Sequence, residues 1–176
     1  MKSLFMRLPD LTDRPPASPG AGAGPPVEVA DKAAAPALAR LLELAFADGW
    51  DVARVESELF DDPTVVAAFV VYDGDLAVAT ASARLLPDAY PGAGYVHWVA
   101  SDPRARGRGL GRVVMAAVLE RFRQEGMTGA VLETDDHRLA AIRLYLSTGF
   151  VPVHRGEDDA ARWEAVFGRL AEYRAG

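Results

Sequence analysis

The feature that constrains this chain most is a basic, glycine-rich loop that joins an apolar run to a helical pattern. The apolar run covers residues 95–100, and a proline at position 103 precedes the loop. After the loop, apolar residues recur at the i, i+3, i+4 spacing of a core-facing helix: Leu110, Val113, Val114, Ala117, Val118 and Phe122. The loop region carries Arg104, Arg106, Arg108 and Arg112. Because the first N–H groups of a helix point outward, this stretch predicts a site for a phosphate or pyrophosphate.

The glycines of this loop restrict which phosphate ligand it could hold. Gly107, Gly109 and Gly111 lack a Cβ, so the backbone can curl tightly and approach a bulky ligand. A nucleoside-triphosphate loop ends in Gly-Lys-Ser/Thr, whereas Arg112 and Val113 follow Gly111. The dinucleotide fingerprint G-x-G-x-x-G needs a third glycine at position 112 or 114, where Arg and Val stand. The residues therefore exclude both motifs.

Two stretches of this chain resemble the GNAT superfamily of N-acetyltransferases. Residues 106–111, Arg-Gly-Arg-Gly-Leu-Gly, resemble its R/Q-x-x-G-x-G/A acyl-coenzyme A signature. Residues 141–150, Ala-Ile-Arg-Leu-Tyr-Leu-Ser-Thr-Gly-Phe, resemble its A-x-x-L-Y-x-x-x-G-F segment and follow an apolar run in the expected order. For the loop taken alone, the alternative interpretation is a solvated basic turn at a helix start. The resemblance covers about residues 27–155 and implies an α/β (α+β) fold, with a mixed, mostly antiparallel, twisted sheet of about six or seven strands and about four or five helices.

The resemblance implies acetyl-coenzyme A as the acyl donor. Backbone groups of Val99 and Ser101, on the strand before the loop, would bind the pantetheine arm as an added strand does. Arg138 stands where many members have Asn, and it could still reach a phosphate. The cofactor-binding residues expected in this way are Val99, Ser101, Arg106, Gly107, Arg108, Gly109, Leu110, Gly111, Arg112 and Arg138.

Acetyl transfer from a thioester to an amine needs a proton acceptor for the amine, polarisation of the carbonyl and a stabilised leaving thiolate. Tyr145 matches the tyrosine of the superfamily at the thiolate end, so we expect it to be the general acid; a core-edge aromatic is the alternative. Two residues are candidates for the general base. They are His97, whose ordinary pKa of about 6.5 suits the task, and Glu133, at the end of the next apolar run.

Composition excludes several other classes of protein. With 19 basic and 25 acidic residues the net charge is −6, which argues against general nucleic-acid binding. The resemblance implies direct attack in a ternary complex, and the chain has no cysteine that could carry a thioester in a ping-pong route. The three histidines show no metal-ligand spacing, and no metal is expected. No apolar run approaches the roughly 20 residues of a membrane span, and no signal peptide is recognised, so we expect a cytoplasmic protein.

The remaining pattern predicts an arm followed by one domain. Residues 1–26 are predicted to be an N-terminal arm or linker, because 9–26 are rich in Pro, Gly and Ala, with at most a short edge strand at 4–8. Residues 27–176 are predicted to form the acetyltransferase domain. Helices are expected over 31–47, 51–60, 110–125, 139–147 and 158–173, the last packing through Trp163, Val166, Phe167 and Leu170. Strands are expected over 64–72, 75–86, 95–101, 130–134 and 150–154, with a hairpin at Asp73-Gly74.

The expected function is therefore transfer of the acetyl group from acetyl-coenzyme A to a primary amine of a small molecule. Two alternatives stay open: acetylation of a protein lysine or N-terminus, and a non-catalytic acyl-coenzyme A-binding sensor. The sequence does not identify the acceptor, since one fold serves many acceptors. A homodimer is the default expectation for the oligomeric state.

Overall fold

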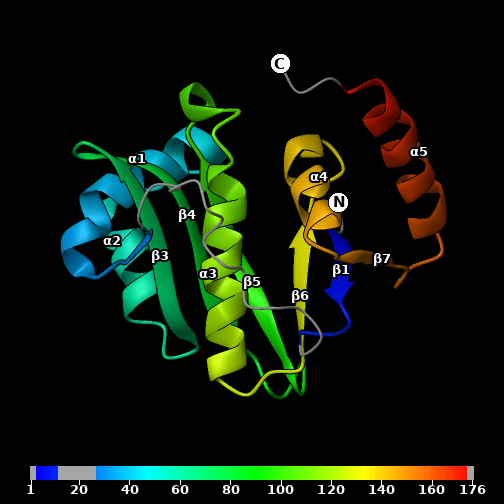
Figure 1. Cartoon of the computed structure of the whole chain (residues 1–176), viewed down its shortest axis with the longest axis horizontal. Coiled ribbons are helices and arrows are strands. Elements are labelled where there is room, and N and C mark those ends of the chain that lie inside the picture. Colours follow the sequence, from blue (N-terminus) through cyan, green and yellow to red (C-terminus); the bar gives the residue numbers. More distant parts are fainter. Residues whose placement is uncertain (1–2, 12–26, 174–176) are drawn as a thin grey trace.

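The computed structural model describes residues 3–11 and 27–173, which form one seven-stranded sheet flanked by helices (Figure 1). The strands are β1 (Leu4–Leu8), β2 (Val27–Val29), β3 (Val65–Asp73), β4 (Leu76–Leu85), β5 (Ala93–Ser101), β6 (Gly129–Thr134) and β7 (Val151–Val153). The α-helices are α1 (Ala35–Phe46), α2 (Val52–Val55), α3 (Leu110–Gln124), α4 (Leu139–Ser147) and α5 (Asp159–Glu172). Single turns of 3-10 helix at 32–34 and 103–105 and a π-type turn at 56–60 complete the described helices. The predicted α/β fold with a mixed sheet is confirmed.

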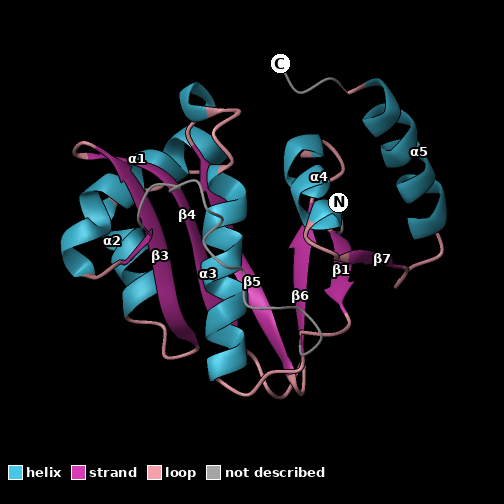
Figure 2. Ribbon diagram, in the orientation of Figure 1, coloured by secondary structure: helices cyan, strands magenta, loops and turns pink. Residues whose placement is uncertain are grey.

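The strand order is β2-β3-β4-β5-β6-β1-β7, and all neighbours are antiparallel except β5 and β6. β5 pairs with β6 only over residues 93–95 and 129–131. Beyond that point the two strands diverge, as Figure 2 shows from the bottom of the view upward. Among the described strands, the far half of β5 therefore has no partner on its β6 side, which opens the sheet at its middle.

β1 lies inside the sheet, which corrects the expectation of an edge strand at residues 4–8. It pairs with β6 from Leu4↔Thr134 to Leu8↔Ala130, and with β7 through Phe5↔Val153. Leu4, Met6 and Leu8 are at most 3% exposed. The sequence shows the alternation of a strand but not its partners, which are more than 100 residues away along the chain. The rest of the predicted arm, residues 1–2 and 12–26, lies outside the described residues.

The two faces of the sheet carry separate hydrophobic clusters. One cluster joins α1 and α2 to the β3–β5 face through Leu38, Leu42, Trp50 and Val55. The other joins α3, α4 and α5 to the opposite face and includes Phe122, Ile142, Tyr145 and Trp163. The diverging strands β5 and β6 therefore leave an opening with helices on both sides.

Most predicted elements are confirmed within a few residues, including the hairpin, in which Asp73 pairs with Leu76. The buried face of α3 is wider than predicted, since Met115 and Leu119 are also buried. The reason is that α3 contacts β3, β4 and β5 together. Phe167 was predicted to pack on the domain, but its side chain is 45% exposed on α5.

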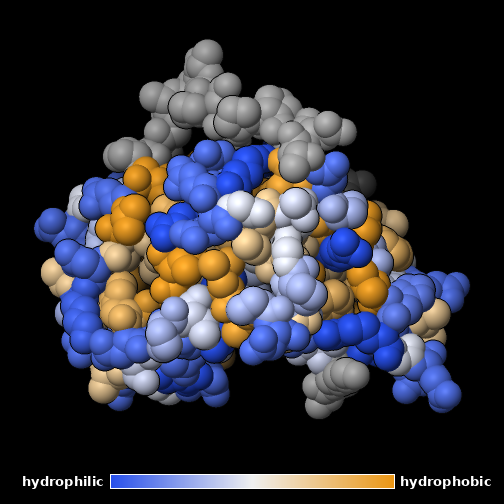
Figure 3. Space-filling view, turned by 90° about the horizontal axis from the view of Figure 1, so that it is seen from below, coloured by the Kyte–Doolittle hydropathy of each residue, from blue (hydrophilic) through white to orange (hydrophobic). Residues whose placement is uncertain are grey.

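The described surface mixes polar and apolar residues. On the face shown in Figure 3, hydrophobic residues appear in patches between charged ones. None of the helices in the described ranges combines the length and the apolar character needed to cross a membrane.

Candidate active site

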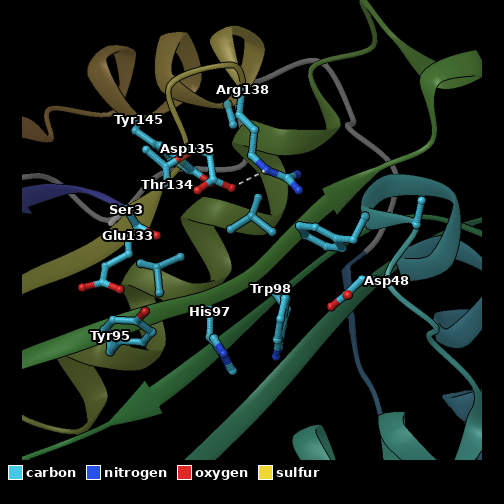
Figure 4. A pocket seen from close by; sticks show the side chains of 15 residues that line it. Ser3, Asp48, Tyr95, His97, Trp98, Glu133, Thr134, Asp135, Arg138 and Tyr145 are labelled. Atoms are coloured by element: carbon cyan, nitrogen blue, oxygen red, sulfur yellow. Dashed lines mark hydrogen bonds and ion pairs between the residues drawn. The ribbon is translucent and has the colours of Figure 1, made fainter. Parts of the chain in front are cut away.

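The divergence of β5 and β6 creates a cavity of about 420 Å³ (Figure 4). Its walls are β5, the end of β6 with the residues that follow it, α4, and the end of α1. The lining residues are Ser3, Phe46, Ala47, Asp48, Tyr95, Val96, His97, Trp98, Val99, Glu133, Thr134, Asp135, Arg138, Ala141 and Tyr145. The structure thus brings together Tyr145, both predicted base candidates, Val99 and Arg138, whereas Ser101 and the loop 106–112 lie outside this lining.

Tyr145 projects from α4 into this cavity with its ring almost fully buried, at 5% exposure. Its ring lies 6.2 Å from that of Phe150, which fixes its position. The hydroxyl makes no hydrogen bond within the described residues. Burial raises the pKa of Tyr145 above its ordinary value of 10.0. The phenol is therefore protonated at neutral pH, which is the form that can donate a proton.

His97 lies on β5 and lines the same cavity. Within the described part of the chain, its Nδ1 atom is buried and has no hydrogen-bond partner. Burial, reinforced by the positive charge of Arg84, lowers the pKa of His97 from 6.5 to about 4. The imidazole is therefore neutral at neutral pH.

This pKa predicts how stability depends on pH. Because the folded-state pKa lies below the unfolded value, the unfolded chain binds the extra proton between pH 6.5 and pH 4. The contribution of the neutral His97 imidazole to stability is fully present above pH 6.5. Below that pH the free energy of unfolding decreases, by on the order of 3 kcal/mol in total when the pH reaches about 4. Urea unfolding at pH 7 and pH 4.5 measures the difference in the free energy of unfolding between the two pH values. In His97→Gln this difference should be smaller. The exposed His154→Gln is the matched control; an equal pH dependence in His97→Gln would contradict the assignment.

Glu133, at the end of β6, places a carboxylate at the edge of the cavity. Nη2 of Arg155 lies 2.5 Å from its Oε1 atom, and the Glu133 side chain is 35% exposed. The guanidinium of Arg155 also lies 3.8 Å from the ring centroid of Phe5 on β1. The strand β1 thus helps to hold the cation that orients this carboxylate.

Arg138 precedes α4 and reaches across the cavity toward α1. Its guanidinium carbon lies 4.4 Å from the ring centroid of Phe46, and its Nε donates to Oδ2 of Asp135 at 3.3 Å (Figure 4). A phosphate contact of Arg138 stays a prediction, because its guanidinium lies at the cavity rather than on the loop 106–112.

The glycine–arginine loop has the geometry of an anion site. Gly107 and Gly109 have φ values of 78° and 71°, in the left-handed region that favours glycine. Asp102 orders the start of the loop, since its Oδ1 accepts from the backbone N of Arg104 at 2.9 Å. Among the described residues, the side chains of Arg106 and Arg112 are exposed and make no hydrogen bond or ion pair. These two cations and the N-terminus of α3 fit a pyrophosphate.

Two of the loop arginines are already paired. Arg104 forms an ion pair with the buried Asp102 at 2.7 Å. Arg108 pairs with Asp73 from the turn between β3 and β4. At the end of the loop, a Cβ on Gly111 would lie 2.8 Å from Cδ2 of Leu144, the residue before Tyr145. The loop and the tyrosine helix are therefore in close contact.

Several cavity residues were not predicted from the sequence. Trp98, Tyr95, Asp48 and Ser3 line the cavity, and no motif in the sequence indicates them. Phe46 on α1 also lines the cavity, whereas Trp50 lies outside the lining and is 5% exposed. No group of three or more His, Asp or Glu in residues 3–11 and 27–173 could hold a metal ion.

The fold agrees with a comparison to known protein families. A sequence model described as "Acetyltransferase (GNAT) family" matches residues 35–150, more than half of the chain. This chain belongs to the GNAT acetyltransferase family. The matched range of this GNAT domain includes the glycine–arginine loop and Tyr145.

The GNAT chain is also similar to curated proteins named mycothiol acetyltransferase. It is 34% identical over 112 residues to the one from Nocardia farcinica, an alignment that covers 60% of this chain and 36% of that protein. It is 36% identical over 99 residues to the one from Beutenbergia cavernae, covering 56% and 32%. The chain spans about a third of the length of the curated relatives it matches.

Solved structures share the fold of this GNAT domain. The ribosomal-protein-S18-alanine N-acetyltransferase of Escherichia coli has a TM-score of 0.62 at 21% identity, covering 73% of this chain and 79% of that one. AAC(6')-Iy in complex with the bisubstrate analogue CoA-S-monomethyl-acetylneamine has a TM-score of 0.64 at 16% identity, covering 74% and 93%.

Proposed function

We propose that this chain transfers the acetyl group of acetyl-coenzyme A to a primary amine of a small molecule, with both substrates bound together. The observation that carries the proposal is one cavity lined by a protonated, buried phenol, Tyr145, and an exposed carboxylate, Glu133. The relatives named mycothiol acetyltransferase favour a small-molecule acceptor. A cytoplasmic location and a homodimer stay predictions from the sequence.

The donor site is supported by two features of this chain. Arg106, Arg112 and the first N–H groups of α3 would hold the pyrophosphate of coenzyme A. The free edge of β5 beyond residue 95 leaves backbone groups near Val99 and Ser101 for the pantetheine arm. When bound, acetyl-coenzyme A supplies the acetyl thioester.

The cavity residues account for both proton transfers of the reaction. Glu133 accepts the proton that the amine loses as its nitrogen forms a C–N bond with the acetyl carbonyl carbon. Tyr145 donates its phenolic proton to the leaving sulfur as the C–S bond breaks, so that an amide and a thiol result. The phenol then regains a proton from solvent.

Glu133 suits the role of base better than His97 does. Burial of the imidazole, and after it the nearby positive charge of Arg84, disfavour a proton on His97 and lower its pKa to about 4. The carboxylate of Glu133 is partly exposed and can pass its proton to water. We therefore assign the base to Glu133 and leave His97 neutral as part of the cavity wall.

The first test compares melting temperatures with acetyl-coenzyme A, coenzyme A, ATP and NADH. A ligand present at a hundred times its Kd stabilises the native state by about 2.7 kcal/mol. We expect shifts confined to the two coenzyme A ligands, and smaller shifts in the Arg106→Ala/Arg112→Ala variant. Arg121→Ala, on the same helix and paired with Glu125, is the control that keeps the shift.

The second part of this test measures thiol release with a panel of primary amines and identifies the product by mass. Glu133→Gln should keep the thermal shift and lose about 10²-fold in turnover, whereas His97→Gln should keep most of its turnover. A shift in melting temperature with ATP as large as that with the coenzyme A ligands would show that the loop is a general anion-binding turn. Binding without turnover of any small amine would favour the sensor or a protein acceptor.

A further inference from the structure

The β5 wall of the cavity is a continuous row of aromatic rings. The ring of Trp98 lies 4.7 Å from His97, 5.3 Å from Phe46 and 4.6 Å from Trp50. His97 lies 5.7 Å from Tyr95, which continues the row toward Glu133 (Figure 4). Trp98 is thus the centre of the row and contacts three other rings.

A β-bulge in β5 places these rings side by side. Ser82 pairs with His97 and Thr80 pairs with Ala100, so both Trp98 and Val99 stand opposite Ala81. In a regular strand His97 and Trp98 would point to opposite faces of the sheet. Here Val99 packs in the α3 cluster, and Trp98 joins His97 on the α1 side.

The bulge holds Trp98 in a strained backbone conformation. Its φ is 46°, in the left-handed region where a non-glycine residue is uncommon. Glycine would adopt this φ without strain, but it would supply no ring. The contacts of the Trp98 ring hold the residue in this strained backbone conformation. Backbone strain of this kind is concentrated at ligand sites.

The carboxylates around this wall are already paired with arginines. Glu133 is bound by Arg155 at 2.5 Å, Asp135 by Arg138 at 3.3 Å, and Asp48 by Arg54 at 3.1 Å. A polyhydroxylated acceptor would have to compete with these arginines for the carboxylate oxygens. An acceptor with a flat aromatic ring could instead pack on the aromatic row and leave the pairs intact.

We propose that the acceptor is a primary amine joined by a short chain to a flat aromatic ring, and that Trp98 is the residue that selects the ring. This inference rests on the proposed acetyl transfer. The amine nitrogen lies at the Glu133 end of the row, and the ring packs toward Trp98. The ring centroids of Tyr95 and His97 are 5.7 Å apart, and those of His97 and Trp98 are 4.7 Å apart. These distances correspond to a short chain between the amine nitrogen and the ring of the acceptor.

The test compares 2-phenylethylamine with 2-cyclohexylethylamine, which have the same carbon skeleton but a flat and a puckered ring. Calorimetry on the complex of the protein with coenzyme A should show about threefold to tenfold tighter binding of the phenyl compound. Trp98→Leu should abolish this ratio, and Trp98→Phe should retain part of it. Trp163→Phe, a change at a buried tryptophan outside the cavity lining, is the matched control and keeps the ratio. A thermal shift with coenzyme A verifies that each variant is folded.

The outcomes separate this inference from the proposed function. Equal binding of the two amines, tighter binding of glucosamine, or a ratio that survives Trp98→Leu would overturn the ring preference. Acetylation of both amines at similar kcat/KM would leave the proposed function intact and remove the inference. The predicted binding ratio with no acetylation of either amine would support the ring site and contradict the proposed function.

Discussion

Replacing Tyr145 with Phe is expected to lower kcat for acetyl transfer by about 10²–10⁴-fold, the usual contribution of a general acid. The substitution removes only the hydroxyl, so the buried ring and its contact with Phe150 remain. Binding of coenzyme A, measured by its thermal shift, should therefore be unchanged. Steady-state thiol release with saturating amine measures the loss.

Tyr72→Phe provides the matched control for Tyr145→Phe. Tyr72 lies on β3 outside the cavity lining, and burial also raises the pKa of its phenol. This variant should retain kcat within about twofold, since a partly buried surface-side hydroxyl is worth little. Turnover of Tyr145→Phe close to that of the parent protein would show that another group protonates the leaving sulfur.

The second large effect is expected from Gly94→Ala, and it concerns stability. A Cβ at this position would lie 2.2 Å from Cδ1 and 2.3 Å from Cγ of Phe122 on α3. The backbone cannot move away easily, because Gly94 pairs with Leu85 on one side and with Ala130 on the other. Phe122 is itself fully buried. We expect a loss of about 3 kcal/mol or more in the free energy of unfolding, measured by urea denaturation.

Two further variants test the cause of this loss. Gly168→Ala, in the middle of α5 with nothing near its Cβ position, should stabilise the protein by about 0.5–1 kcal/mol. In the double variant Gly94→Ala/Phe122→Ala, the new methyl group occupies the space left by the ring. The double variant should therefore lose less free energy of unfolding than the sum of the losses of the two single variants. Strict additivity would show that the contact between Gly94 and Phe122 is not the reason.

Local patterns were sufficient to predict most elements of this fold. The helical spacing of apolar residues located α3 and α5, and the Asp73-Gly74 pair located the hairpin. The prediction that the loop 106–112 binds an anion rests on residue type alone, because glycine spacing and arginine content are local properties. Each of these signals depends only on residues close together in the chain.

The sequence did not reveal which elements would be neighbours. β1 has the alternation of a strand, yet only its pairing with β6 and β7 shows that it lies inside the sheet and carries the ring on which Arg155 packs. Arg108 and Arg106 look equivalent in the loop, but Asp73, from a distant turn, pairs with Arg108 alone. Such partners come from segments far apart in the chain, which local periodicity does not specify.

The sequence by itself determined the family and the α/β fold, and it predicted the anion loop and the tyrosine expected to be the acid. The tertiary structure decided the properties that depend on burial and on distant neighbours. These are the low pKa of His97, the position of Arg138 over Phe46, and the turn of Trp98 onto the cavity wall. The physical reason is that residue type and spacing act over a few residues, whereas desolvation, charge and ring contacts arise only when separate elements pack together.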